Sequence, residues 1–260
     1  MAKEILAFDS VDISYENGEV LHDISFSLME GEILGLVGES GSGKTTAIKS
    51  ILGLLNDGVV SKGNINYRGE NLLSLSEREM RQIRGAEIGM IFQDSKDSLS
   101  PIRTIGSQIL ESMAAHAKIN KSEAKAKALD LFNRLNFHDP EKIWNSHPFE
   151  LSGGMNQRIG IAMSMLTEPS VLLADEPTSA LDVAVQKQVV QELLSLREIF
   201  NTAIIIVTHD IGVVSAMADK ILVLKDGYSV EYGVARDVLN TPKHEYTKLL
   251  LSCVPRLNKK

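Results

Sequence analysis

The sequence predicts an α/β protein with a mainly parallel sheet, an antiparallel β-subdomain near the N-terminus and a helical insert. Short runs of β-branched residues and leucine at 33–37, 171–174 and 204–208 indicate buried parallel strands, because a strand covered on both faces needs no polar alternation. Helical patterns lie between these runs, and strands that alternate with helices are typical of the α/β class. Up to about residue 70, polar and apolar residues alternate instead, which favours antiparallel strands.

Turn signals separate the alternating strands. At each one, a glycine follows a polar residue, and the pairs are Asn17-Gly18, Glu30-Gly31 and Arg68-Gly69. Glycine adopts the left-handed conformations of tight turns without a steric cost. We therefore expect antiparallel strands between these turns.

Two helices are predicted beside the parallel strands. One spans 45–55 and follows a glycine-rich turn. The other spans 181–200, where apolar residues recur at helical spacing at Val185, Val189, Leu193 and Leu196.

The middle of the chain, about 96–165, is predicted to be a mostly helical insert. From 105 to 135 the pattern is helical, with Ile105, Ile109 and Met113 on one face, and Ser122 is the expected N-cap of the stretch that ends at residue 135. A further helix is expected after 151–154, ending near Leu166 ahead of a proline.

Charge and cysteine content exclude several classes of function. The 260 residues carry 27 Lys and Arg against 34 Asp and Glu, a formal net charge of −7, which argues against a general affinity for nucleic acid. The single cysteine, Cys253, excludes an intramolecular disulfide and a multi-cysteine metal site and fits a reducing compartment. The start of the chain does not resemble a signal peptide, and no apolar run approaches the ~20 residues of a membrane span. We expect other chains to supply the spans if the protein works at a membrane.

A phosphate-binding loop is predicted at 38–45, where the sequence fits G-x-x-x-x-G-K-[ST] between a predicted strand and a predicted helix. Such a loop points backbone N–H groups at phosphate oxygens, and the helix N-terminus adds positive potential. Lys44 would reach the β- and γ-phosphates, and the Thr45 hydroxyl would bind Mg²⁺. The predicted nucleotide-binding residues here are Gly38, Ser40, Gly41, Ser42, Gly43, Lys44, Thr45 and Thr46. This motif predicts a P-loop NTPase core.

Two adjacent acids, Asp175 and Glu176, follow the predicted strand at 171–174. Ligands of parallel sheets bind outside the carboxyl ends of the strands, so we expect these acids to face the same nucleotide as Lys44. Asp175 would hold Mg²⁺, and Glu176 could polarise the attacking water. The alternative is that one of the two acids caps the next helix.

A second anion site is predicted at Ser152, Gly153 and Gly154, at the start of a helix. In isolation these residues could equally be an ordinary helix cap. Residues 151–155, followed by Gln157 and Arg158, resemble the signature sequence of the ATP-binding-cassette (ABC) ATPases.

Further stretches resemble the other ABC motifs, in the order in which that family has them. Tyr15 resembles the aromatic residue on which adenine stacks, and Gln93 resembles the Q-loop glutamine. Residues 179–182, which end at Asp182, resemble the D-loop, and His209 resembles the switch histidine. Each residue alone has a structural explanation, such as core packing for Tyr15 or a helix cap for Asp182. The resemblance rests on their common order from about residue 4 to about 251.

The resemblance implies one ABC ATPase domain that binds ATP and Mg²⁺. About 1–95 and 166–235 would form the nucleotide-binding core, about 96–165 the helical subdomain, and 236–260 a C-terminal tail. In this family the signature of one subunit completes the phosphate site of a second, so two subunits close over two ATP molecules. The implied catalytic residues are Lys44, Gln93, Glu176 and His209; the metal ligands are Thr45, Gln93 and Asp175; and the signature residues and Asp182 contact the nucleotide.

Two stretches, 91–101 and 241–250, resemble the peptide and nickel importers of this family. Two residues depart from the usual pattern, Glu245 in place of proline and Met155 in place of the commoner glutamine. The implied partners are two membrane permease subunits, a second ATP-binding subunit that is a paralogue or a second copy and, indirectly, an extracytoplasmic substrate-binding protein. The implied location is the cytoplasmic face of the cell membrane, with no nucleic-acid partner.

Two other functions fit the sequence less well. Soluble ABC ATPases that act on nucleic acid or ribosomes usually carry two cassettes or a long coiled-coil insert, and this chain has neither. A non-hydrolysing regulatory subunit would predict a damaged Glu176, His209 or signature sequence, and all three are intact.

Overall fold

The computed structural model describes residues 3–93, 98–179 and 181–252. The chain forms two compact units. The first consists of Met1–Met80 and Ala203–Lys260, and the second consists of Arg81–Thr202. Among the described residues, no helix is both long enough and apolar enough to cross a lipid bilayer.

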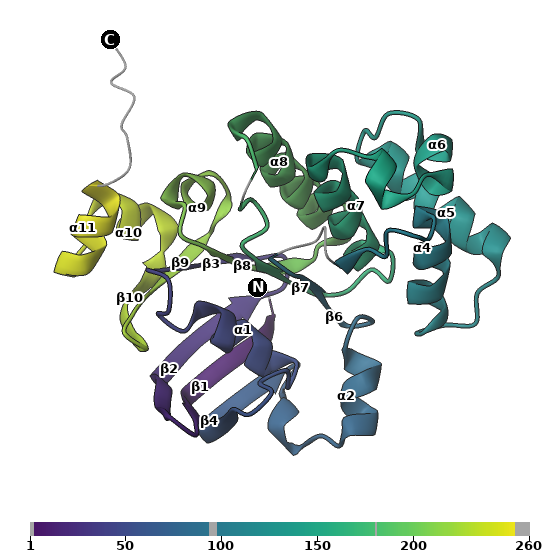
Figure 1. Ribbon diagram of the computed structural model, residues 1–260. Helices are drawn as coiled ribbons and strands as arrows, with labels where there is room; N and C mark the ends of the chain where they lie inside the picture. The colour runs from purple at the N-terminus through teal and green to yellow at the C-terminus, as the bar shows by residue number, and fades with distance from the viewer. Residues whose placement is uncertain (1–2, 94–97, 180, 253–260) are drawn as a thin grey trace, which may run out of the picture. The chain divides into compact units, whose positions relative to one another are not determined.

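The first unit is built on a mixed sheet (Figure 1). Its strands are β1 (Glu4–Tyr15), β2 (Gly18–Met29), β3 (Ile33–Val37), β4 (Val59–Tyr67), β5 (Glu70–Asn71), β8 (Ala203–Thr208), β9 (Lys220–Lys225) and β10 (Tyr228–Val234). Within this unit they lie in the order β5-β4-β1-β2-β10-β9-β3-β8. β1 pairs antiparallel with β2 and β4, whereas β3 pairs parallel with β8 and β9. The antiparallel β-subdomain and the parallel core are therefore both confirmed.

The register of β3 fixes the edge at which its loop lies. Ile33 pairs with Ile204 and Val37 pairs with Thr208, so the carboxyl ends of β3 and β8 coincide. All residues of both strands are buried. The segments that follow Val37 and Thr208 therefore begin side by side.

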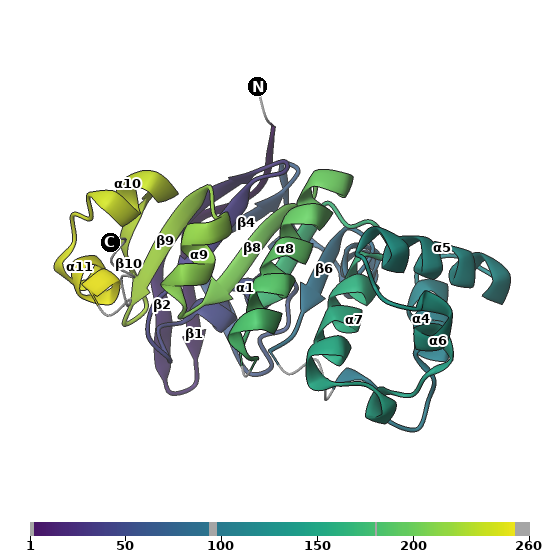
Figure 2. The same cartoon turned by 90° about the horizontal axis from the view of Figure 1, so that it is seen from above.

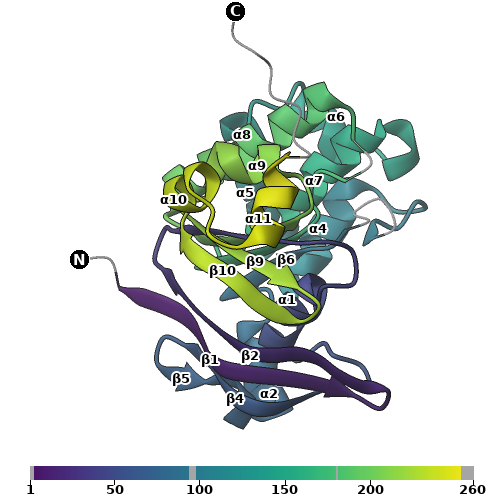
Figure 3. The ribbon, with the colours of Figure 1, turned by 90° about the vertical axis from the view of Figure 1, so that its left-hand side faces the viewer.

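Helices cover both faces of this part of the sheet. α1 (Lys44–Ile51) and α9 (Ile211–Met217) lie on opposite faces of β3 and β8 (Figures 1 and 2). α10 (Ala235–Asn240) and α11 (Glu245–Ser252) lie beside β10 (Figure 3). α1 ends earlier than the predicted residue 55, because the N–H of Leu54 turns back to the Lys49 carbonyl at 3.0 Å.

The second unit combines a parallel pair of strands with five of the α-helices that the structure describes. β6 (Ile88–Ile91) pairs parallel with β7 (Val171–Asp175), and α7 (Gly153–Met165) packs on β6. The other helices are α4 (Ile105–Ala114), α5 (Lys121–Arg134), α6 (Pro140–Asn145), α8 (Val183–Phe200) and the 3₁₀ turn η2 (Pro148–Glu150). In the first unit, η1 (Leu72–Ser74) precedes α2 (Glu77–Ile83), and the sequence boundary between the units falls within α2, after Met80.

The helical stretch predicted at 105–135 forms two helices, α4 and α5, with a connection at 115–120. The predicted N-cap, Ser122, is wrong. The side chain of Asn120 accepts from the Glu123 N–H at 3.0 Å, and the Glu123 carboxylate accepts from the Asn120 N–H at 3.1 Å. Each side chain satisfies an N–H that the start of a helix leaves unpaired, so the helix begins after Asn120.

Candidate functional site

The loop at 38–43 connects β3 to α1, and two of its glycines have no room for a side chain. A Cβ at Gly38 would lie 2.1 Å from the Leu224 carbonyl oxygen. A Cβ at Gly43 would lie 2.3 Å from Leu21 Cδ2, and Gly43 also has a positive φ of 95°. Any L side chain at these positions would displace the loop, so the predicted phosphate loop depends on both glycines.

Lys44 is the first residue of α1, and its side chain folds back over this loop. It is 5% exposed, and its ammonium donates to the carbonyl oxygens of Gly38 at 2.8 Å and Glu39 at 2.7 Å. The first turn of α1 contains no acidic residue. A buried cation and a helix N-terminus therefore coincide at one loop, which is the electrostatic arrangement that stabilises a phosphate group.

His209 follows β8 directly, as Gly38 follows β3. Because Val37 pairs with Thr208, the switch-histidine candidate and the phosphate loop leave neighbouring strands at the same edge of the sheet. His209 is exposed, and the next residue, Asp210, caps α9 by accepting from the Gly212 N–H at 2.7 Å. The role of His209 at a phosphate stays a prediction.

Tyr15 is the last residue of β1 and is partly exposed. Gly58 packs closely on its ring, since a Cβ at Gly58 would lie 2.7 Å from the Tyr15 ring atoms. The structure places Tyr15 at the β1–β2 turn, and its contact with adenine stays a prediction.

In the second unit, three predicted residues share one sheet edge. Ile91 pairs with Ala174, so Gln93 follows β6 at the edge where β7 ends in Asp175 and Glu176 follows. Asp175 is buried, whereas Glu176 adopts an uncommon left-handed φ of 45°. Such a backbone conformation costs on the order of 1–3 kcal/mol and is enriched at functional sites. Residues 94–97 of the predicted post-glutamine segment lie outside the described residues.

Ser152 caps α7, with its hydroxyl accepting from the Met155 N–H at 3.2 Å. Gly154 packs against α8, because a Cβ there would lie 2.7 Å from Val185 Cγ1. The amide of Gln157 donates to the Pro177 carbonyl at 2.9 Å, which ties this helix to the chain just after Glu176. The signature segment and the two acids are therefore linked within one unit.

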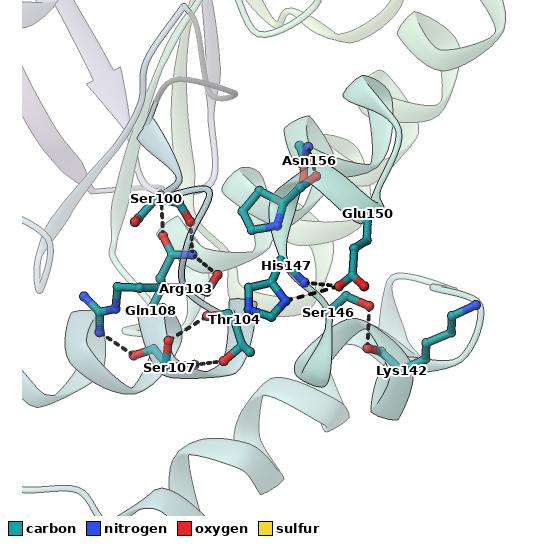
Figure 4. A network of polar contacts seen from close by, with 11 residues as sticks. Ser100, Arg103, Thr104, Ser107, Gln108, Lys142, Ser146, His147, Glu150 and Asn156 are labelled. Atoms are coloured by element: carbon teal, nitrogen blue, oxygen red, sulfur yellow. Dashed lines mark hydrogen bonds and ion pairs between the residues drawn. The ribbon is translucent and has the colours of Figure 1, made fainter.

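A polar network organises the chain before α7 (Figure 4). Asn156 donates to the Pro148 carbonyl at 2.9 Å, and His147 donates its N–H to Glu150 at 2.6 Å. The Gln108 side chain accepts from the Ser100 N–H at 2.7 Å and donates to the Ser100 carbonyl at 3.1 Å. The bonds of Asn156 and His147 order the chain that leads into α7, and the bonds of Gln108 hold Ser100 against α4. Asp182 caps α8 by accepting from the Ala184 and Val185 N–H groups, both at 3.0 Å, and Ala180 of the D-loop lies outside the described residues.

A buried ion pair that sequence analysis missed holds α7 to α8. The Arg158 guanidinium contacts the Glu192 carboxylate, donates to the Leu135 carbonyl at 3.0 Å and lies 4.1 Å from the centre of the Phe137 ring. Burial raises the pKa of Glu192 to about 7, against the lowering effect of Arg158. The pair is 34 residues apart in sequence, and no local pattern links its members.

Sequence analysis also missed Tyr246 of α11. Its hydroxyl accepts from the N–H of Glu39 in the phosphate loop at 2.9 Å, across 207 residues of sequence. The predicted tail resemblance at 241–250 contains this tyrosine but gives no signal of the contact.

No group of three or more metal-binding side chains gathers among the residues at 3–93, 98–179 and 181–252. The candidate metal ligands Thr45, Gln93 and Asp175 were predicted to act with the phosphates of a bound nucleotide. All three offer the oxygen atoms that Mg²⁺ prefers, so their chemistry fits this ion.

Comparison with known proteins identifies the family. Residues 21–179 match the model described as ABC transporter, and residues 230–260 match the model described as oligopeptide/dipeptide transporter, C-terminal region. The chain is 46% identical over 239 residues to the oligopeptide transport ATP-binding protein AmiE of Streptococcus pneumoniae, covering 91% of this chain and 67% of that protein. It is 43% identical over 233 residues to the dipeptide transport ATP-binding protein DppD of Escherichia coli, covering 89% and 71% of the two chains.

Solved structures share the fold. One is cbiO1 from Clostridium perfringens, described as part of the ABC transporter complex cbiONQ, with a TM-score of 0.80, 26% identity and 90% of each chain covered. Another is the ATP-binding cassette MJ0796, as a dimer in a post-hydrolysis state bound to ADP and phosphate, with a TM-score of 0.77, 27% identity and 89% and 99% of the two chains covered. The chain belongs to the ABC transporter family and is one of its ATP-binding, ATP-hydrolysing proteins.

Proposed function

We propose that this chain is the ATP-hydrolysing subunit of an importer for peptides, or for nickel or other metal chelates, and that it works by ATP-driven closure of a pair of subunits. One observation carries the proposal: the chain holds two separate glycine-containing helix N-termini suited to phosphate, one at 38–45 in the first unit and one at 152–154 in the second. If each ATP molecule is bound between two subunits, the binding energy of ATP drives the closure of the interface between them, and hydrolysis reopens the interface.

The cargo proposal rests on the C-terminal region and on named relatives. Residues 230–260 match a region described for oligopeptide and dipeptide transporters, and both relatives above are named for peptide transport. This favours peptides over nickel chelates. The remaining parts of the proposal are two membrane permease subunits, a second ATP-binding subunit, an indirect extracytoplasmic binding protein and a peripheral location on the cytoplasmic face of the membrane.

The residues have distinct proposed roles toward ATP. The Gly38–Gly43 loop and the α1 N-terminus hold the phosphates, and the Lys44 ammonium exchanges its carbonyl partners for the β- and γ-phosphates. Glu176 orients and polarises the attacking water, and His209 orients the γ-phosphate. Gln93 connects this chemistry to the helical insert, and Tyr15 stacks on adenine. Mg²⁺, held by Thr45, Asp175 and Gln93, would offset the negative charge of the phosphates.

The mechanism is tested by two substitutions. Glu176→Gln removes the group proposed to activate water and keeps the shape of the side chain, so ATP should bind without turning over. In ATP and Mg²⁺ this variant should pair more stably than wild type, as measured by light scattering. Equal pairing with and without nucleotide would contradict closure.

Lys44→Ala removes the buried ammonium and should abolish nucleotide binding, measured with a fluorescent ATP analogue. Lys49→Ala, at the other end of α1, is the matched control and should bind normally. Unchanged ATP affinity of the Lys44 variant would overturn the assignment of the loop.

A further inference from the structure

The C-terminal helix α11 reaches the phosphate loop through a single hydroxyl. Tyr246 is 5% exposed, and its phenolic oxygen accepts the hydrogen bond from Glu39 N–H at 2.9 Å. We propose that Tyr246 is a positioning residue for the nucleotide site, whose hydroxyl holds the Glu39 peptide and so keeps the phosphate loop in its binding shape. The inference deepens the proposed function and rests on it.

The phenol is held in place from several directions. Its ring belongs to a buried cluster that includes Val37, the last residue of β3, and Val223 of β9. The Lys225 ammonium lies 5.2 Å from the centre of the ring, a distance suited to a cation–π contact. With the ring packed on the strand that leads into the loop, the hydroxyl has a fixed position beside Glu39.

The turn before α11 is fixed as well. The Glu231 carboxylate of β10 accepts from the N–H groups of Lys243 at 2.9 Å and His244 at 3.1 Å. The Tyr246 N–H donates to Nδ1 of His244 at 3.1 Å. Burial raises the pKa of Tyr246, so its hydroxyl is neutral at physiological pH. The group that accepts from Glu39 at physiological pH is therefore a neutral phenol.

The backbone of Glu39 links Tyr246 to Lys44 by hydrogen bonds. The N–H of Glu39 is held by Tyr246, while its carbonyl accepts from the Lys44 ammonium at 2.7 Å and from the Ser42 N–H at 3.2 Å. A residue bonded at both its N–H and its carbonyl has little freedom to rotate. Removing the phenolic oxygen would let the Glu39 peptide turn, and the loop would then have to be reordered each time a nucleotide binds.

Tyr246→Phe tests this directly, because it keeps the ring and removes only the acceptor. One neutral hydrogen bond corresponds to about 0.5–1.5 kcal/mol, so we expect ATP to bind about two- to twelvefold more weakly. The KM for ATP should rise by a similar factor while kcat changes less. A merely structural role would lower the active fraction, and hence kcat, without moving the dissociation constant.

The matched control is Tyr232→Phe. Tyr232 also bonds a backbone through its hydroxyl, accepting from the Ser27 N–H at 3.3 Å and donating to the Ser27 carbonyl at 3.1 Å, but it does so away from the loop. Thermal unfolding of the full chain is followed for both variants, and the control should keep wild-type ATP affinity. Wild-type affinity in the Tyr246 variant, or equal weakening in both variants, would overturn the inference.

The wild-type and Lys44→Ala chains are measured in the same titration. If wild type binds ATP and Lys44→Ala does not, the proposed function stands, and the Tyr246 result decides the inference alone. If wild type binds no ATP, the proposed function itself fails, and the inference fails with it.

Discussion

Glu192 is buried at 4% exposure, yet only one of its carboxylate oxygens has a partner. Oε1 contacts Arg158, whereas Oε2 has no hydrogen-bond partner among the described residues. A buried ion pair often gains less from attraction than it loses in desolvation. We therefore infer that this pair fixes the position of α7 relative to α8 and lowers the free energy of unfolding near neutral pH.

The raised pKa of Glu192 gives this cost a pH dependence. The folded pKa is about 7 against 4.5 for an ordinary glutamate, so between these values the folded state holds a proton that the unfolded state releases. The proton on Glu192 therefore contributes fully to the free energy of unfolding below about pH 4.5. This contribution, of up to about 3 kcal/mol, is lost as the pH rises through about 7.

Glu192→Gln should remove this pH-dependent contribution to the free energy of unfolding. The loss of unfolding free energy between about pH 5 and about pH 8, measured by urea denaturation, should be smaller than in wild type by up to the same amount. Glu198→Gln, an exposed change on the same helix, is the control. Parallel pH profiles for wild type and Glu192→Gln would contradict the interpretation.

At the scale of elements, α5 shows how a short motif sets a helix start. Asn120 and Glu123 form a reciprocal pair of side-chain bonds to the backbone, whereas Ser122, the predicted cap, is exposed within the first turn. Asparagine is among the best N-cap residues, and a glutamate three positions later completes the box. The signal was therefore in the sequence, two residues before the serine.

Asn120→Ala should lower the free energy of unfolding by about 1 kcal/mol, because it leaves N–H groups of the first turn unsatisfied. Ser122→Ala should change it by less than about 0.5 kcal/mol, the usual range for an exposed surface position. Both values come from chemical denaturation of the full chain. A larger effect at Ser122 than at Asn120 would show that the helix starts later.

At the scale of the whole molecule, the two candidate phosphate sites lie in different units of the chain. The loop at 38–43 and Lys44 lie in the first unit, and Ser152 to Gly154 lie in the second. The proposed pairing of two subunits gives each of these motifs a partner. The signature motif should then matter for pairing and not for ATP binding by a single chain.

Ser152→Asp in the Glu176→Gln background tests this. Aspartate caps helices as well as serine does, so α7 should remain folded, while its charge repels a phosphate. We expect ATP binding by the single chain to persist and ATP-dependent pairing to be lost in light scattering. Thr104→Asp is the matched control, since the Thr104 hydroxyl accepts from the Ser107 N–H at 3.3 Å at the start of α4. Pairing that survives Ser152→Asp would contradict a composite site.

Local sequence patterns predicted the groups of neighbouring residues that make up the candidate site. The phosphate loop, the two acids at the end of β7 and the cap of α7 each lie within a few consecutive residues, so their spacing defines which backbone and side-chain groups can act together. The same holds for the buried strands β3, β7 and β8, whose apolar runs are continuous. Local patterns predicted the ends of helices less accurately: α1 ends before the predicted residue 55, and α5 begins before the predicted cap.

The contacts that position these residues became visible with the folded chain. The register of Val37 with Thr208 brings His209 to the edge of the phosphate loop, and the bond from Glu39 to Tyr246 spans 207 residues. Arg158 meets Glu192 in the same way, across two helices. Such partners depend on strand order and helix packing, which arise from the burial of many side chains at once and leave no periodic trace in the sequence near either residue.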